Sequence, residues 1–506
     1  MPKFTLFALV CSTTYLAYTV QLEDIEFIVT QSLYQTVDML EVREITIEIA
    51  HDGFKTGKFT AKELASAFLE RIAKWDKAGP RINSTMAMSV TALEEAEALD
   101  YYLKEHGKLM GRLHGIPVLI KDQADTKGMV TTYGSAVARH NIPDEDAFVV
   151  TKLKEAGAVI LGKTTLAEWA TVWFSANGAT DYEFTKNPYN LVYDVGASSG
   201  GSGAAVAANF AILAVGEDTG GSIRVPSSFC NIVGLRPTPG LISRTGFCPL
   251  IKVQDTPGPM ARTVTDCALM LDCMVGFDPR DEFTGFAATA AALGLPKGVN
   301  RVILAAIDKL QSSGTTFVDV YIENLDHYMI YPLTYLQRSR SDINSFLATK
   351  PHLPQDIADI LPEKSDTPYM STLCAVAHGP KDPRSDPTYL DRILVRDEFK
   401  RKVDCLIASL GLDALTLPDV RVPPPRFEDA ANGRFMKNGE EDFPTNTYLA
   451  SVTRHPAISV PAGFTEDGLP VGMELIGLEY QEQTLLELAY GIETIIGGRK
   501  APPAPF

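Results

Sequence analysis

The sequence predicts a single large α/β/α sandwich, in which helices cover both faces of a central mixed β-sheet. Short apolar runs alternate with helical patterns over much of the chain, as expected for strands that are buried on both faces. The 506 residues are 45% hydrophobic and 22% charged, a composition typical of folded globular proteins. No internal repeat and no linker marks a second domain, so we expect one domain over residues 38–500.

Residues that start or stop helices mark the ends of several predicted elements in the first half of the chain. A capping box starts the first helix, and glycines end the later ones. The strands are short apolar runs without alternation, which is typical of buried strands. In order, the elements are a helix from Thr60 that ends at Ala78-Gly79-Pro80, a helix at 91–105 that ends at Gly107, a strand at 113–122, a helix at 146–156 closed by Gly157, a strand at 158–161, a helix at 201–209 and a strand at 210–215.

The last elements are predicted near the C-terminus. Ala457–Val460 and Val471–Ile476 flank a Glu466-Asp467-Gly468 turn, which indicates a β-hairpin. A helix at 481–495 closes the fold, whereas the pattern between 283 and 441 is weaker. Active sites of such sheets gather in loops beyond the strand ends. Lys121 and the loop Gly216–Ser222 lie at two such ends.

Charge and targeting signals restrict the partners of the chain. A net charge of −17 argues against nucleic acid, whose binding needs a basic surface. Lys3 precedes an apolar stretch to Val20 and a polar stop at Gln21, which has the shape of a signal peptide over residues 1–20. A membrane anchor or an ordinary N-terminal extension is the alternative, and the segment is short and polar for a stable membrane span. A signal peptide implies the secretory pathway; without one we expect a cytoplasmic protein.

The cysteines indicate neither a metal site nor a disulfide framework. Apart from Cys11, they are scattered and have no metal-ligand or redox spacing. We interpret them as buried apolar residues, and we expect no metal and no cofactor. They are Cys230, Cys248, Cys267, Cys273, Cys374 and Cys405.

Two serines framed by glycine are the candidate reactive residues. Ser198 lies in Gly196-Ala197-Ser198-Ser199-Gly200-Gly201, and Ser222 follows Gly220-Gly221 directly. Glycine is entropically costly to order, so two such clusters need a reason beyond ordinary turns. Close approach of backbone N–H groups to developing negative charge is one such reason.

Two motifs compete with this interpretation. Residues 157–164 match a phosphate-loop pattern letter for letter, but the residues between the glycines form the strand itself and cannot cradle phosphate. Residues 196–200 match the nucleophile elbow of α/β-hydrolases. That fold needs a strong preceding strand and a histidine partner, yet Leu191–Val195 is a poor strand and His455 is more typical of a structural residue. We therefore disfavour both nucleotide binding and a Ser-His-Asp triad.

The second serine fits nucleophilic chemistry better. A serine after two glycines at a strand end exposes its hydroxyl. The N–H groups of Thr219, Gly220, Gly221 and Ser222 can converge there on an oxyanion. A tight turn before a capped helix is the structural alternative, and the combination with Ser198 and Lys121 argues against it.

Several separate motifs occur in an order that resembles the amidase signature family. The resemblance covers about Leu40 to Phe277 and resumes over Pro456–Ile495. The two serines have the spacing of that family. The motifs are Lys121-Asp122 after Gly115-Ile116-Pro117-Val118, the run Gly196–Ser202, Asp218–Pro226, Gly234-Leu235-Arg236-Pro237-Thr238 and Asp255–Arg262.

The resemblance implies a Ser–Ser–Lys triad that hydrolyses linear carboxylic amides. Ser222 would be the nucleophile, and Ser198, after a cis peptide bond, would link it to Lys121. Lys121 would be the base, so burial must lower its pKa from about 10.4. Ser199 and the Asp218–Arg224 pair would support the triad from outside. The substrate would be a small-molecule amide, and a homodimer is compatible with the resemblance.

One departure from the family pattern leaves alternatives open. After Pro296-Lys297-Gly298 the chain continues almost at once with Val302–Leu310, where the family has a longer segment. The triad lies outside this gap, but a wall of the substrate pocket does not. A catalytically inactive binding protein with the same fold, or a subunit of a tRNA-dependent amidotransferase, remains the alternative to a free-standing hydrolase.

Overall fold

A computed structural model describes residues 40–284, 309–310, 312–318, 320–361, 367–437, 440–441 and 443–506. Val42–Phe506 forms one compact unit. The predicted signal peptide at 1–20 and residues 299–308 of the shortened stretch after Gly298 lie outside the described residues. Among the residues that are described, no helix is long and apolar enough to cross a membrane.

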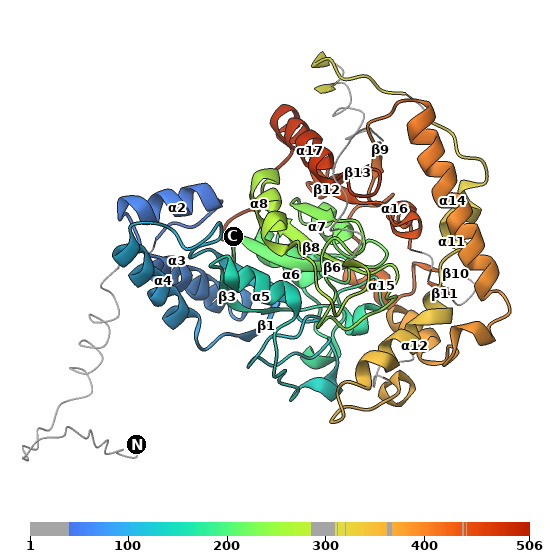
Figure 1. The fold of residues 1–506 in the computed structure, drawn as a ribbon, viewed down its shortest axis with the longest axis horizontal. Helices are drawn as coiled ribbons and strands as arrows, with labels where there is room; N and C mark the ends of the chain where they lie inside the picture. The colour runs from blue at the N-terminus through green and yellow to red at the C-terminus, as the bar shows by residue number, and fades with distance from the viewer. Residues whose placement is uncertain are drawn as a thin grey trace, which may run out of the picture. The chain divides into compact units, whose positions relative to one another are not determined.

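A nine-stranded mixed sheet forms the centre of this unit, as the sequence predicts (Figure 1). Three neighbouring strands, β3, β2 and β6, are parallel, and every other pairing is antiparallel. In spatial order the strands are β1 (Thr85–Met88), β3 (Val159–Thr164), β2 (Pro117–Lys121), β6 (Leu213–Asp218), β8 (Thr256–Ala261), β7 (Val233–Arg236), β12 (Ala457–Phe464), β13 (Pro470–Ile476) and β9 (Leu415–Pro418).

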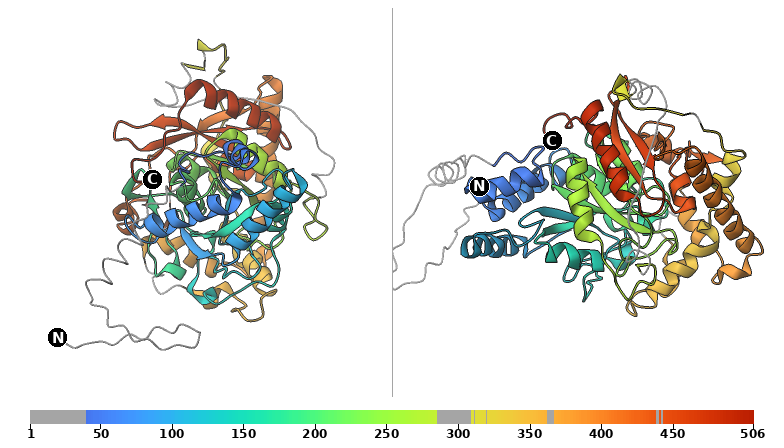
Figure 2. Two further views of the ribbon diagram at one scale, coloured as in Figure 1. Left: turned by 90° about the vertical axis from the view of Figure 1, so that its left-hand side faces the viewer. Right: turned by 45° about the horizontal axis from the view of Figure 1, so that its top comes forward.

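Helices pack on the sheet along most of its width (Figures 1 and 2). α6 and α7 contact one another, and α7 lies on β7, β12 and β13. α8 and α17 form a second contacting pair on β8 and β12. These elements and the N-terminal helices are α2 (Ile47–Thr56), α3 (Ala61–Arg71) continued by a π-helical turn (Ile72–Asp76), α4 (Ala92–His106), α5 (Phe148–Glu155), α6 (Gly200–Ala207), α7 (Arg224–Phe229), α8 (Val264–Met274) and α17 (Glu482–Ile496).

A further helical layer comes from the part of the chain where the sequence pattern is weak (Figure 1). Its long helix α14 packs on α16, and α12 packs on α13. Its elements are α11 (Leu325–Ile330), α12 (Tyr335–Leu347), α13 (Ser371–Ala377), α14 (Tyr389–Ser409), α15 (Phe427–Ala431) and the small ribbon β10–β11 (Met436–Lys437, Glu440–Glu441). α16 (Tyr448–Thr453) follows this stretch, and a second small ribbon, β4–β5 (Lys186–Asn187, Asn190–Asp194), comes before α6 in the chain.

Most of the predicted elements are confirmed, with shifted ends. The Thr60–Glu63 capping box is present, and the predicted hairpin is β12–β13. Leu191–Val195 is more of a strand than expected, since β5 forms there, but it lies outside the main sheet, where it pairs with β4 and forms an isolated bridge from Tyr193 to Arg426. The expectation of buried cysteines holds for three of the six, whereas Cys405 is exposed.

The sheet brings chemically distinct residues to one edge. β2 and β6 run parallel and end in Lys121 and Asp218, so their carboxyl ends lie side by side. β8 runs antiparallel to β6, with Thr256 opposite Asp218. Asp255, just before β8, therefore reaches the same edge, where ligands of α/β sheets commonly bind.

Close packing of α6 on the end of β3 requires glycine at one position. A Cβ on Gly201 would lie 2.4 Å from the backbone oxygen of Thr165 and 2.6 Å from its nitrogen. No side chain fits at that distance without moving the strand end or the helix. A Cβ on Gly491, in the middle of α17, would have no atom within 4 Å.

Gly201→Ala is therefore expected to lower the free energy of unfolding by about 1–3 kcal/mol, the usual effect of overpacking. Gly491→Ala is the matched control and should raise it by about 0.5–1 kcal/mol, because alanine is the better helix former. Chemical denaturation of both variants measures the difference. Equal effects at the two positions would contradict the packing argument.

Candidate active site

Lys121 lies in a desolvated position with three partners. Its Nζ is 2.7 Å from Ser198 Oγ, 3.1 Å from the carbonyl oxygen of Glu217 and 3.2 Å from Glu217 Oε2. Lys121 and Ser198 are fully buried. Burial lowers the pKa of Lys121, and the carboxylate of Glu217 opposes this shift. Burial thus shifts Lys121 toward the neutral amine that a general base needs, next to a serine hydroxyl.

Ser198 is held by the backbone around it. The Ala197–Ser198 peptide bond is cis, as the resemblance implies. The next residue, Ser199, donates its hydroxyl to the carbonyl oxygen of Glu217 (3.0 Å) and accepts the N–H of Glu217 (3.1 Å). Ser199 also donates its own N–H to the carbonyl oxygen of Ser222 (3.1 Å). Ser199 therefore connects the two serine segments directly.

Ser222 is the accessible member of the group. It keeps 8% of its surface exposed, whereas Lys121 and Ser198 keep none. Among the hydrogen bonds of the described residues, none involves the Ser222 hydroxyl, and none joins it to Ser198 Oγ. Catalytic hydrogen bonds are often long in the absence of substrate. The structure thus brings Ser198 to Lys121 and leaves the Ser222 hydroxyl without a hydrogen-bond partner among the described residues.

Three of the four predicted oxyanion donors are available. The N–H of Gly221 donates to Asp218 Oδ1 at 3.0 Å, so it is already used. No hydrogen bond between described residues takes up the N–H groups of Thr219, Gly220 or Ser222. Gly221 has a φ of 138°, a conformation that favours glycine.

Two side chains approach this loop so closely that only glycine fits. A Cβ on Gly220 would lie 2.2 Å from the Tyr335 hydroxyl, and one on Gly221 would lie 2.1 Å from Thr447 Oγ1. Thr447 also donates its hydroxyl to the carbonyl oxygen of Gly220 (2.6 Å). The paired glycines therefore serve close approach from α12 and from the residue before α16.

A buried cluster of charges fixes the shape of the loop. Asp218 accepts the N–H of Ile223 (2.9 Å) in addition to that of Gly221. Arg224 and Arg236 bind its carboxylate at 2.9 and 2.8 Å. Burial alone would raise the pKa of Asp218, but the two guanidinium groups outweigh it and hold that pKa well below its ordinary value. The carboxyl group of Asp218 is thus held in its negatively charged form at this edge of the sheet.

The cluster extends to the C-terminal hairpin. Arg224 also donates to Glu474 of β13, to the carbonyl oxygen of Thr447 (2.9 Å) and to Ser451 Oγ (2.7 Å). Arg236 donates to the carbonyl oxygen of Gln254 at 2.8 Å. The predicted Asp218–Arg224 pair is therefore part of a larger network that joins β6, α7, β7, β13 and α16.

Sequence reasoning missed two acidic residues of the site. Glu217 contacts Lys121 directly, and Asp255 reaches the same place from the start of β8. Glu217 could have been noticed, because a carboxylate that ends an apolar strand next to a glycine loop is unusual. Only the antiparallel pairing of β8 with β6 brings Asp255 close.

The competing motifs do not form the sites that their patterns suggest. β3 includes Gly162, Lys163 and Thr164, so the phosphate-loop pattern is a strand, as predicted. The ammonium group of Lys163 forms a buried ion pair with Asp122 at 3.3 Å. His455 contacts Asp404 and Thr453, each at 2.7 Å, which agrees with a structural role.

Comparison with known proteins adds independent evidence. The family model described as "Amidase" matches residues 63–284 and 284–486. The chain is 32% identical to a subunit of the glutamyl-tRNA(Gln) amidotransferase of Alkaliphilus metalliredigens, over 92% of this chain and 99% of that protein. It is 34% identical to the corresponding protein of Carboxydothermus hydrogenoformans, over 92% and 99% of the two chains.

A solved structure has the same fold. The native peptide amidase of Stenotrophomonas maltophilia superposes with a TM-score of 0.78 at 30% identity, covering 92% of this chain and 99% of that one. The match to the family model extends over both halves of the domain, and the cis serine, the buried lysine and the glycine-framed serine lie within it. The chain belongs to the amidase signature family, whose enzymes act on carbon–nitrogen bonds.

Proposed function

We propose that the protein hydrolyses carboxylic amides through an acyl-enzyme on Ser222. The observation that supports this most directly is the 2.7 Å contact between Lys121 Nζ and Ser198 Oγ, beside a serine that is itself partly exposed. A buried amine in contact with a hydroxyl can accept its proton. No other described lysine combines this burial with a serine partner of that kind.

The proposed cycle moves one proton along the three residues. Ser222 Oγ attacks the amide carbonyl carbon while its proton passes to Ser198 Oγ, whose own proton passes to Lys121 Nζ. The oxyanion that forms accepts hydrogen bonds from the N–H groups of the 219–222 loop that have no other acceptor among the described residues. The proton then returns along the same path to the departing amine nitrogen, which breaks the C–N bond. Water repeats these steps on the acyl-enzyme and releases the carboxylate.

Aromatic side chains beside the loop favour a substrate with apolar surface. Trp173 stacks on Phe443 (5.3 Å between ring centres) and meets Tyr448 edge-on at 5.6 Å. Tyr448 in turn lies 6.5 Å from Tyr335, whose hydroxyl approaches Gly220. Trp173, Tyr335 and Tyr448 are half-buried, so their rings can contact a bound ligand.

The names of the relatives keep one alternative open. The sequence relatives are named as parts of an amidotransferase, whereas the solved protein is named a peptide amidase. A free-standing hydrolase turns over amides as the purified chain alone. A component of an amidotransferase would need its partner proteins for its reaction, and an inactive binding protein would show neither turnover nor labelling of Ser222.

Ser222→Ala is expected to abolish hydrolysis of an acyl-length series of p-nitroanilides, because it removes the attacking atom. Lys121→Ala should nearly abolish it, and Ser198→Ala should fall between the two. Labelling by a fluorophosphonate probe checks the same residues without a chosen substrate. A folded wild-type chain that is never labelled, or a Ser222→Ala chain that is fully active, would disprove the mechanism.

Asp218→Asn is expected to lower the free energy of unfolding by about 3 kcal/mol or more, since it leaves the buried Arg236 guanidinium without its anion and leaves Arg224 with Glu474 alone. Amide turnover should fall as well, because the 219–222 loop loses the carboxylate that binds its backbone N–H groups. The pKa of Asp218 is lowered, so its contribution is present above the ordinary aspartate pKa of about 4 and is lost in stronger acid. Denaturant titrations at neutral and acid pH measure the effect.

Asp382→Asn is the matched control for that measurement. Asp382 pairs with Arg384 at the surface, where the two side chains are 52% and 79% exposed. Because solvent screens so exposed a pair, its loss should leave the free energy of unfolding almost unchanged. Similar losses from Asp218→Asn and Asp382→Asn would contradict the role assigned to the buried cluster.

A further inference from the structure

Glu217 presents a paradox for a lysine that must act as a base. Its Oε2 lies 3.2 Å from Lys121 Nζ, and the two side chains are 1% and 0% exposed. A full carboxylate at that distance stabilises the ammonium form, which cannot accept a proton. Something must therefore limit the negative charge on Glu217.

The hydroxyl of Thr219 points to an answer. Its Oγ1 lies 3.1 Å from Glu217 Oε1 and 2.6 Å from Asp255 Oδ1, both within hydrogen-bond distance. A hydroxyl has one hydrogen to donate. When it donates to one carboxylate, its other contact is a hydrogen bond only if the second carboxyl group carries a proton. The geometry thus favours one proton shared by the two carboxyl groups.

The surroundings of Asp255 hold it in this arrangement. Its carboxyl group accepts the N–H of Leu250 (2.8 Å) and of Ile251 (3.0 Å). It is 3% exposed. Burial and the neighbouring Glu217 raise the pKa of Asp255 to about 7, in agreement with a pair that resists holding two negative charges. The proton belongs to the pair as a unit.

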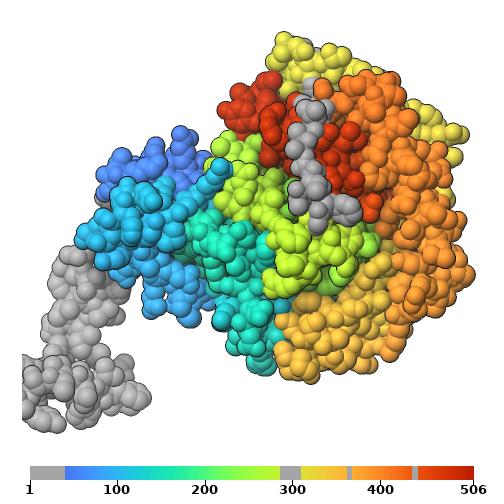
Figure 3. All heavy atoms as spheres, viewed as in Figure 1, coloured from blue at the N-terminus to red at the C-terminus, as the bar shows by residue number. Residues whose placement is uncertain are grey.

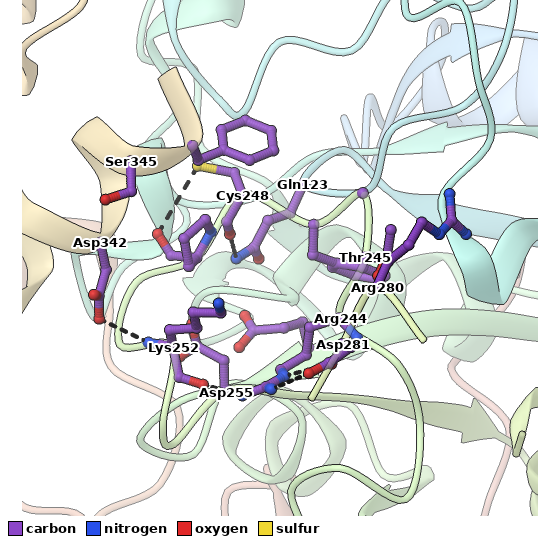
Figure 4. Close-up of a pocket in the computed structure, with 15 residues that line it drawn as sticks. Gln123, Arg244, Thr245, Cys248, Lys252, Asp255, Arg280, Asp281, Asp342 and Ser345 are labelled. Atoms are coloured by element: carbon purple, nitrogen blue, oxygen red, sulfur yellow. Dashed lines mark hydrogen bonds and ion pairs between the residues drawn. The ribbon is translucent and has the colours of Figure 1, made fainter. Parts of the chain in front are cut away.

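The pair also borders solvent. Glu217 and Asp255 both line a cavity of about 240 Å³, which Ser222 does not line. Figure 4 shows Asp255 there together with Gln123, Cys248 and residues of α12. In the space-filling view the yellow-orange segment that contains α12 lies against yellow-green residues (Figure 3), and Asp342 of α12 accepts the N–H of Lys252, in the loop before β8, at 2.9 Å.

Other charged groups face the pair, and most of them have partners of their own. Asp218 is held by Arg224 and Arg236, and Arg244 pairs with Asp281. These partners hold the side chains of Asp218 and Arg244 in position whether or not Glu217 and Asp255 share a proton. The titratable and charged groups that face Lys121, Glu217 and Asp255 or line the cavity are Asp218, Arg236, Arg244, Cys248, Lys252, Arg280, Asp281, Tyr335 and Asp342.

We propose that Glu217, Thr219 and Asp255 form a one-proton carboxyl pair that sets the charge state of Lys121. Glu217 is then a positioning residue for the base, and Asp255 acts through Glu217 by sharing its proton across the Thr219 hydroxyl. The cavity lets the pair exchange that proton with water. This inference rests on the proposed function, because it assumes that Lys121 activates Ser222.

The test is the pH dependence of the rate at which a fluorophosphonate labels Ser222. Glu217→Gln removes the charge beside Lys121, so the pKa of Lys121 falls and the acid limb of the rate profile moves down by about one pH unit or more. Asp255→Asn leaves the whole charge on Glu217, so the acid limb moves up. The double variant should move the acid limb down at least as far as Glu217→Gln alone, because the Asp255 carboxylate also raises the pKa of Lys121.

Ser345→Ala is the matched control. Ser345 lines the same cavity and donates its hydroxyl to the carbonyl oxygen of Ser341 (2.8 Å), so its loss should leave the acid limb in place. Thermal unfolding checks that each variant is folded. If only one of the two single variants folds, the direction in which its acid limb shifts is enough to test the proposal.

Three outcomes would overturn the proposal. In the first, the acid limbs of both single variants stay where they are in the wild-type chain. In the second, both acid limbs shift in the same direction. In the third, neither single variant folds, which would mean that Glu217 and Asp255 serve only the stability of the fold. A wild-type chain without any labelling of Ser222 would instead disprove the proposed function, so the two failures are distinguishable.

Discussion

The carboxylate of Asp218 is the point on which the rest of the site depends. It is buried at the end of β6 and binds the guanidinium groups of Arg224 in α7 and Arg236 in β7 and two backbone N–H groups of the loop that follows β6. An isolated buried charge would be very costly, but this one is compensated on both oxygens. Because Arg224 also reaches Glu474 and Thr447, the same cluster positions the C-terminal hairpin against this edge of the sheet.

Burial determines the chemistry of Lys121 in a different way. A lysine at a strand end in water would be protonated, whereas one with no exposed surface has a lowered pKa. The neighbouring carboxyl groups oppose this shift, so the reactivity of the amine depends on a balance between desolvation and charge. That balance is set by residues from β2, β6 and the start of β8, which the sheet brings together.

Much of the fold and of the triad could be predicted from residues close together in the sequence. The capping box at Thr60, the apolar strand into Lys121 and the glycine-framed Ser222 are local patterns with local physical causes. The strand at Asn190–Asp194 is not predicted well from its own residues, because they are mostly exposed and the strand forms by pairing with β4. The helical layer around α12 and α14 carries no comparable local signal.

The sequence by itself determined the fold class, the family and the three residues that resemble a Ser–Ser–Lys triad, because each rests on short motifs of fixed order. Only the tertiary structure decided that Glu217 contacts Lys121, that the N–H of Gly221 is already used by Asp218, and that Asp255 meets Glu217 across the Thr219 hydroxyl. The physical reason is that contacts across β2, β6 and β8 depend on strand order and direction. No spacing along the chain encodes that Thr256 lies opposite Asp218.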